Sequence, residues 1–124
     1  MSIILHITQR YQWEQAILVQ FYTGDTLESE GFIHCSTELQ VIKVANTWFP
    51  NQQGLVLLAI DSDKVESEIR YEGFGEERFP HIYGPLNLNA VVKVFDFEPN
   101  EDGFELPKDL INITEEGYMQ KQLV

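Results

Sequence analysis

Runs of apolar residues separated by polar turns predict three long strands. Residues 3–8 and 90–97 are rich in β-branched and aromatic side chains, which are typical of strands. The run at 54–61 has no polar face, so we expect it to be the central strand. A membrane-spanning helix needs about 20 apolar residues. Because every apolar run here is much shorter, we expect no insertion into a membrane.

Two segments have the periodicity of amphipathic helices. The stretch at 9–19 carries an imperfect apolar stripe, and Thr8 is expected to cap its first turn. The second helix has a better signature, because Thr37 and Gln40 fit a capping box and Pro50 would end the helix. Its apolar positions recur at helical spacing and are Leu39, Ile42, Ala45, Trp48 and Phe49.

Shorter extended segments complete the pattern. Residues 32–36 predict another strand, and residues 68–72 alternate in polarity as an edge strand does. Two prolines bracket residues 81–84, which are therefore extended but cannot form a long central strand, because proline donates no hydrogen bond to a sheet. The succession of strands and helices followed by short strands predicts an α+β fold.

The length of 124 residues and the apolar content of 44% fit one globular domain. We expect this domain to span residues 1–97. An acidic C-terminal extension, residues 98–124, would pack on the domain or trail from it, with a helical segment near 108–113. One cysteine excludes an internal disulfide, and no secretory pattern precedes the first strand, so we expect a cytoplasmic protein.

The charge balance limits the partners. Twenty acidic residues against eight basic ones give a formal net charge of −12, which is unsuited to general nucleic-acid binding. A small nucleotide-like ligand needs only one local cluster of donors, so it remains compatible with this charge. The sequence does not indicate the oligomeric state.

The chain has three histidines, and each is followed two residues later by a hydroxyl residue. Positions i and i+2 of a strand share a face, so each imidazole would lie beside a hydroxyl. Together they could bind a polar ligand, hold a metal ion or transfer protons near neutral pH. Any single histidine could equally be a hydrogen-bonded core residue. The three pairs are His6–Thr8, His34–Ser36 and His81–Tyr83.

Two other kinds of chemistry are weaker candidates. Three imidazoles with an open fourth position activate water in some zinc enzymes, but the spacing of these histidines matches no local metal motif. A three-histidine metal-dependent hydrolase therefore stays an alternative, and we assign no metal ligand. Cys35 would point to the opposite face from its neighbour His34, so we expect a small buried residue rather than a nucleophile.

Three strings of residues together resemble a bacterial protein family, domain of unknown function 952. They are Leu-His-Ile-Thr at 5–8, Glu-Gly-Phe-Ile-His-Cys-Ser at 30–36 and Phe-Pro-His-Ile-Tyr-Gly-Pro-Leu at 79–86. The resemblance covers about residues 3–97, and the family name carries no assigned activity. Its fold is similar to that of ADP-ribosyltransferases, which implies a split β-sheet core with two main helices around an NAD cleft.

The resemblance implies a small NAD- or nucleotide-directed transferase or hydrolase acting at a ribosyl or phosphate centre, with NAD as a possible substrate. His6, Thr8 and Ser36 would bind the ligand, and Arg70 or Arg78 would contact an anionic group. His34, His81 and Tyr83 would be the catalytic residues.

One departure from the superfamily pattern leaves catalysis open. Its commonest members carry a glutamate on a later strand, where this chain has His81 and Tyr83 instead. Glu72, Glu76 or Glu77 could supply a carboxylate, although each is also explained as a solvated charge. A non-catalytic nucleotide- or protein-binding module with a degenerate site is therefore the alternative to an enzyme.

Overall fold

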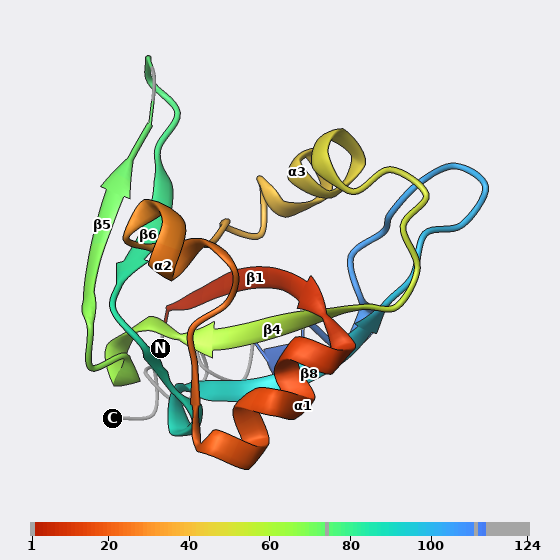
Figure 1. Cartoon of the computed structure of the whole chain (residues 1–124). Coiled ribbons are helices and arrows are strands. Elements are labelled where there is room, and N and C mark those ends of the chain that lie inside the picture. Colours follow the sequence, from red (N-terminus) through yellow and green to blue (C-terminus); the bar gives the residue numbers. More distant parts are fainter. Residues whose placement is uncertain (1, 74, 111, 114–124) are drawn as a thin grey trace.

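The computed structural model describes residues 2–73, 75–110 and 112–113 (Figure 1). It has an α+β fold with three small antiparallel sheets, whose strand orders are β1-β4-β8, β2-β7 and β3-β6-β5. The strands are β1 Ile3–Gln9, β2 Phe21–Tyr22, β3 Ile33–His34, β4 Leu55–Asp61, β5 Glu68–Glu72, β6 Phe79–Tyr83, β7 Leu86–Asn87 and β8 Val91–Phe97. The helices are α1 Arg10–Val19, α2 Thr26–Glu30 and α3 Val41–Trp48, with 3-10 turns η1 Ser62–Lys64 and η2 Leu88–Ala90.

The strand β4 is the centre of the fold. All seven of its residues are buried, and it pairs with β1 on one side and β8 on the other, which confirms the prediction for the run at 54–61. The register shifts between Ala59 and Ile60, so that Val92 is an extra residue of β8. Because of this bulge, Val91 packs on the same cluster as Val94 and not, as strict alternation predicts, on the cluster of Phe95.

The two faces of the central sheet build two apolar clusters. Alternate residues of β4 enter each cluster, with Val56 and Leu58 on opposite sides from Leu57. The first cluster includes Ala16 of α1 and is covered by the β3-β6-β5 sheet, whereas the second includes Val41 and Ala45 of α3. Figure 1 accordingly shows α1 and α3 on different sides of β1, β4 and β8.

The two main helices form where the periodicity predicts them, but their capping differs. The predicted cap by Thr8 is wrong, because α1 follows β1 directly and the Thr8 hydroxyl donates to Gln12 Oε1 (2.6 Å). Half of the predicted capping box forms, since the Thr37 N–H donates to Gln40 Oε1 (3.0 Å).

The predicted apolar stripe of α3 is only partly buried. Val41 and Ala45 are fully buried, whereas Leu39 is 97% exposed and Trp48 is 75% exposed. Leu39 precedes the first helical residue, so it does not share the phase of the helix. Phe49, one residue after Trp48, packs against the second cluster.

The β3-β6-β5 sheet has β5 at its edge, as predicted, but β6 is its central strand despite containing Pro80. The carbonyl of Pro80 accepts from the Cys35 N–H (3.0 Å). The N–H and C=O groups of one strand residue point to the same side, so the proline nitrogen faces β3 at the point where β3 has ended. A five-residue central strand therefore tolerates this proline. Cys35 is buried, as expected.

Residues after 97 contribute to the core. Phe104 stacks on Phe97 with ring centroids 4.8 Å apart, and Leu110 is 1% exposed. Residues 108–110 and 112–113 are helical, as predicted, while residues 114–124 of the predicted extension lie outside the described residues. Within the described part of the chain, no helix is long and apolar enough to span a membrane.

Candidate functional site

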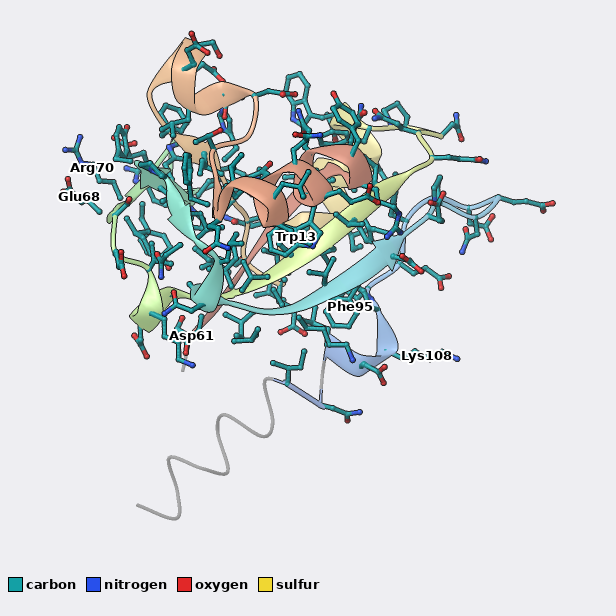
Figure 2. The ribbon with its side chains drawn as sticks, turned by 60° about the horizontal axis from the view of Figure 1, so that its bottom comes forward. Trp13, Asp61, Glu68, Arg70, Phe95 and Lys108 are labelled. Atoms are coloured by element: carbon teal, nitrogen blue, oxygen red, sulfur yellow. The ribbon has the colours of Figure 1, made fainter. Side chains whose placement is uncertain are left out.

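The outer face of the β3-β6-β5 sheet carries four of the eight predicted site residues, including the three predicted catalytic ones. Strand alternation turns Ile33, Ile69 and Ile82 towards the first cluster, so the residues beside them face outwards. Figure 2 shows Glu68 and Arg70 at the outer edge of the molecule. The outward-facing set consists of His34, Glu68, Arg70, Glu72, Phe79, His81 and Tyr83.

His34 and His81 are direct cross-strand partners in β3 and β6. The Cys35 N–H bond to Pro80 makes 35/80 a hydrogen-bonded position, so 34/81 is a non-hydrogen-bonded position, where side chains come closest. The two imidazole rings have centroids 5.2 Å apart and meet edge to face. The structure therefore brings together two of the three predicted histidines.

Phe32 forms one wall of this face. It comes from the link between α2 and β3, and its ring stacks on His81 with centroids 4.1 Å apart. The same ring lies 4.7 Å from the His34 ring and 5.2 Å from the Tyr83 ring. At the end of α2, Glu30 Oε2 lies 2.9 Å from His34 Nε2. The aromatic rings thus form a continuous platform with a carboxylate at its border.

Glu72 supplies a carboxylate to the face. Its Oε1 accepts hydrogen bonds from the Tyr83 hydroxyl and from His81 Nδ1 (3.1 Å). Oε2 has no hydrogen-bond partner among the described residues. The bond from Tyr83, followed by that from His81, holds the pKa of Glu72 below its usual range, so this carboxylate is ionised at neutral pH. The predicted shared face of His81 and Tyr83 is confirmed by their common acceptor.

The other candidate carboxylates and cations lie differently. Glu77 faces Lys43 at 4.0 Å. Arg70 reaches the site, since its guanidinium carbon lies 4.3 Å above the Tyr83 ring, but its Nη2 also donates to Glu68 Oε2 (2.9 Å). Arg78 turns into the β5–β6 loop instead, where it donates to the Gly73 and Gly75 carbonyls (3.1 and 2.6 Å). Arg70 is thus the cation at this face.

His6 is buried behind the site, on β1 of the central sheet. Its Nδ1 lies 2.5 Å from the His34 carbonyl oxygen and its Nε2 lies 2.6 Å from the Tyr22 hydroxyl. A carbonyl only accepts, so Nδ1 carries the proton and Nε2 accepts from Tyr22. Burial lowers the pKa of His6 to about 4, which keeps this imidazole neutral at neutral pH.

The remaining predicted residues also lie inside. Thr8 and Ser36 are buried. The backbone of Ser36 pairs with Leu5 through two hydrogen bonds (2.8 and 2.7 Å), which join the end of the β3-β6-β5 sheet to β1. Because β3 ends at His34, Ser36 does not continue the strand face on which His34 lies.

The histidine positions do not form the three-histidine metal site that the sequence leaves as an alternative. Both ring nitrogens of His6 are occupied by protein partners. In the described residues, no group of three or more potential ligands is arranged to hold a metal ion. The geometry instead presents two imidazoles, an oriented carboxylate and a phenol, which is a set suited to proton transfer and to stabilising a positive charge.

Sequence reasoning missed three residues of this arrangement. Phe32 and Glu30 lie in the string at 30–36 that carries the family resemblance, so the sequence does contain a signal for them. Tyr22 had no such signal, because it precedes no recognisable motif and lies sixteen positions from its partner His6. Only the packing of α1 and β2 against the central sheet brings it there.

Comparisons with known proteins give a family and a fold. Residues 7–94 match the family described as protein of unknown function (DUF952). The crystal structure of protein CC0527 from Caulobacter crescentus is 30% identical over 90% of this chain and 99% of that chain, with a TM-score of 0.79. The solution NMR structure of CC0527 is 32% identical over 90% and 97% of the two chains, with a TM-score of 0.73. No curated protein matches. The chain therefore belongs to the DUF952 family.

Proposed function

We propose that this protein is an enzyme that acts at the ribosyl centre of a small nucleotide-like molecule, with NAD as the candidate substrate and an ADP-ribosyltransferase-like arrangement of its sheets. The observation that carries the proposal is the Glu72 carboxylate, oriented through one oxygen by Tyr83 and His81. Cleavage of a glycosidic bond passes through an oxocarbenium-like state, which a nearby carboxylate stabilises. Glu72 is thus a candidate for the glutamate that the sequence comparison did not locate.

The site residues have distinct roles in this reaction. Ionised Glu72 faces the developing positive charge on the sugar. The Nδ1–H group of His81 donates a hydrogen bond to Glu72, so Nε2 of His81 can accept a proton from the attacking water or hydroxyl. The nucleophile forms a bond to the anomeric carbon while the carbon–nitrogen bond breaks, and the base leaves with that electron pair. Phe32 offers its ring to a planar base, and His34 borders the same space.

Local charge favours a ribosyl centre over a phosphate centre. Two carboxylates, Glu30 and Glu72, contact the two imidazoles. The one guanidinium at this face, Arg70, is paired with Glu68. A phosphoryl group that gains negative charge in its transition state would meet net repulsion, whereas an oxocarbenium ion would meet attraction.

A non-catalytic binding module is the second candidate. The side chains of Glu68 and Arg70 are 61% and 50% exposed, and that of Glu72 is 40% exposed. Glycosyl transfer benefits from the exclusion of water, so this openness favours recognition without turnover.

Calorimetric titration with NAD and with ADP-ribose, combined with an assay of nicotinamide release, tests the proposal. Glu72→Gln keeps the shape of the side chain but removes its charge, and we expect kcat to fall about 100-fold with little change in KM. Glu68→Gln makes the same change two residues along β5 and should leave kcat nearly unchanged. Binding without nicotinamide release would favour the binding module. Failure of wild-type protein to bind either molecule at millimolar concentration would exclude the NAD proposal.

A further inference from the structure

The backbone carbonyl of His34 needs a partner from outside its own sheet. Position 34/81 is a non-hydrogen-bonded one, so the N–H and C=O groups of His34 point away from β6. β3 is an edge strand of this sheet, and among the described residues no strand pairs with His34 on that side. A carbonyl that is left unpaired at a partly buried edge costs free energy and fixes the strand less firmly.

The buried imidazole of His6 takes the place of the missing strand at this point. Its Nδ1–H donates to the His34 oxygen at 2.5 Å, from β1 of the central sheet. One residue earlier, Leu5 exchanges two backbone hydrogen bonds with Ser36. The end of β3 is therefore attached to β1 both by a backbone bridge and by the His6 side chain.

The orientation of His6 is fixed from behind. The Tyr22 hydroxyl donates to Nε2 at 2.6 Å, and the Tyr22 side chain is 2% exposed. Gly24 lies against this tyrosine so closely that a Cβ there would come within 2.9 Å of the hydroxyl oxygen. Tyr22 therefore cannot move freely. Because Nε2 of His6 accepts the hydrogen bond from Tyr22, the neutral imidazole carries its proton on Nδ1 and presents this N–H to His34.

We infer that His6 is a positioning residue for His34, acting through the backbone carbonyl, and that it does not contact the ligand. Holding that carbonyl sets the course of the backbone at His34 and so places its imidazole opposite His81. The inference rests on the proposed function, because the placement of His34 matters for chemistry only if the outer face binds a ligand. It replaces the direct ligand contact that the family resemblance implied for His6.

Nuclear magnetic resonance of the wild-type protein provides the first test, since only three imidazoles contribute signals. We expect the nitrogen shifts of His6 to show a neutral ring with the proton on Nδ1 throughout the neutral range, and cross-relaxation between the His34 and His81 rings. A His6 ring that carries its proton on Nε2, or that becomes protonated in the neutral range, would overturn the inference. This readout needs no substrate, so it is independent of whether the proposed function holds.

Two substitutions of His6 then separate positioning from packing. His6→Asn places an amide N–H near the position of Nδ1, whereas His6→Leu keeps bulk without a donor. We expect His6→Leu to weaken the His34–His81 cross-relaxation and His6→Asn to retain it. If the NAD assay detects turnover, His6→Leu should lower kcat by up to about 100-fold, with His6→Asn retaining more of it.

Leu57→Ala is the control for general loss of packing, because Leu57 faces the second cluster. It should lower stability without changing the contact between the His34 and His81 rings. Folded His6→Leu protein with the wild-type His34–His81 contact would contradict the inference. If His6→Leu does not fold, His6→Gln provides the comparison with His6→Asn, since its longer side chain places the amide near the position of Nε2, towards Tyr22, and leaves the His34 carbonyl without a donor.

Discussion

A buried imidazole that must stay neutral makes folding depend on pH. The pKa of His6 falls from 6.5 to about 4 on folding, mainly because burial penalises the charged ring. Below its unfolded pKa, the unfolded chain binds a proton that the folded protein does not bind. Stability therefore declines as the pH falls from about 6.5 towards 4, and above this range His6 causes no loss of stability.

We predict that the free energy of unfolding drops by ~2 kcal/mol at about pH 5 relative to neutral pH because of His6 alone. Urea denaturation of wild type and of His6→Asn at the two pH values would measure this. The asparagine does not titrate, so its pH dependence should be smaller by that amount. Equal pH dependence in both proteins would mean that His6 is not the group responsible.

At the same scale, the sequence predicts some contacts of the site and not others. His81 and Tyr83 share a face because strand alternation is local, and the pairing of β5 with β6 then brings Glu72 to both side chains. The bond between His6 and Tyr22 depends instead on the turn after α1, which no local periodicity fixes. Likewise, the separation of His6 from the other two histidines follows from the assignment of β1 and β3 to different sheets.

Among the elements, the long strands and both main helices follow from periodicity, and the short elements do not. β4 is recognisable because seven successive residues are buried on both faces. β2 and β7 contain two residues each, too few to show alternation, and they form because the turns around them bring Tyr22 beside Leu86. The helix α2 has only five residues and none of them is buried, so it has no apolar stripe to reveal it.

The start of α3 gives a prediction at this scale. Leu39→Ala should change stability by no more than about 0.5 kcal/mol, because the side chain is 97% exposed. Val41→Ala removes two buried methyl groups and should cost about 2 kcal/mol. Chemical denaturation of both variants checks the pair. A large loss for Leu39→Ala would restore the phase that the sequence pattern predicts for this helix.

For the whole molecule, the two faces of the central sheet are completed by segments far apart in the chain. The β3-β6-β5 sheet covers the first face and carries the candidate site on its own outer face. The second face is covered by α3 and by residues after 97. Composition obscured this second contribution, because acidic residues dominate the C-terminal region and its apolar residues recur at no regular spacing. Phe104, Leu106 and Leu110 nevertheless pack against the second cluster.

Phe104 allows a test of whether that region is part of the folding unit. Its side chain is 4% exposed and stacks on Phe97. Its backbone N–H donates to Oδ1 of Asn46 in α3 (3.0 Å). Phe104→Ala should therefore lower the free energy of unfolding by about 3–5 kcal/mol. Glu105→Ala, at the exposed neighbouring position, should change it by no more than about 0.5 kcal/mol. Urea denaturation followed by tryptophan fluorescence measures both, and equal, small effects would show that residues after 97 are dispensable for the core.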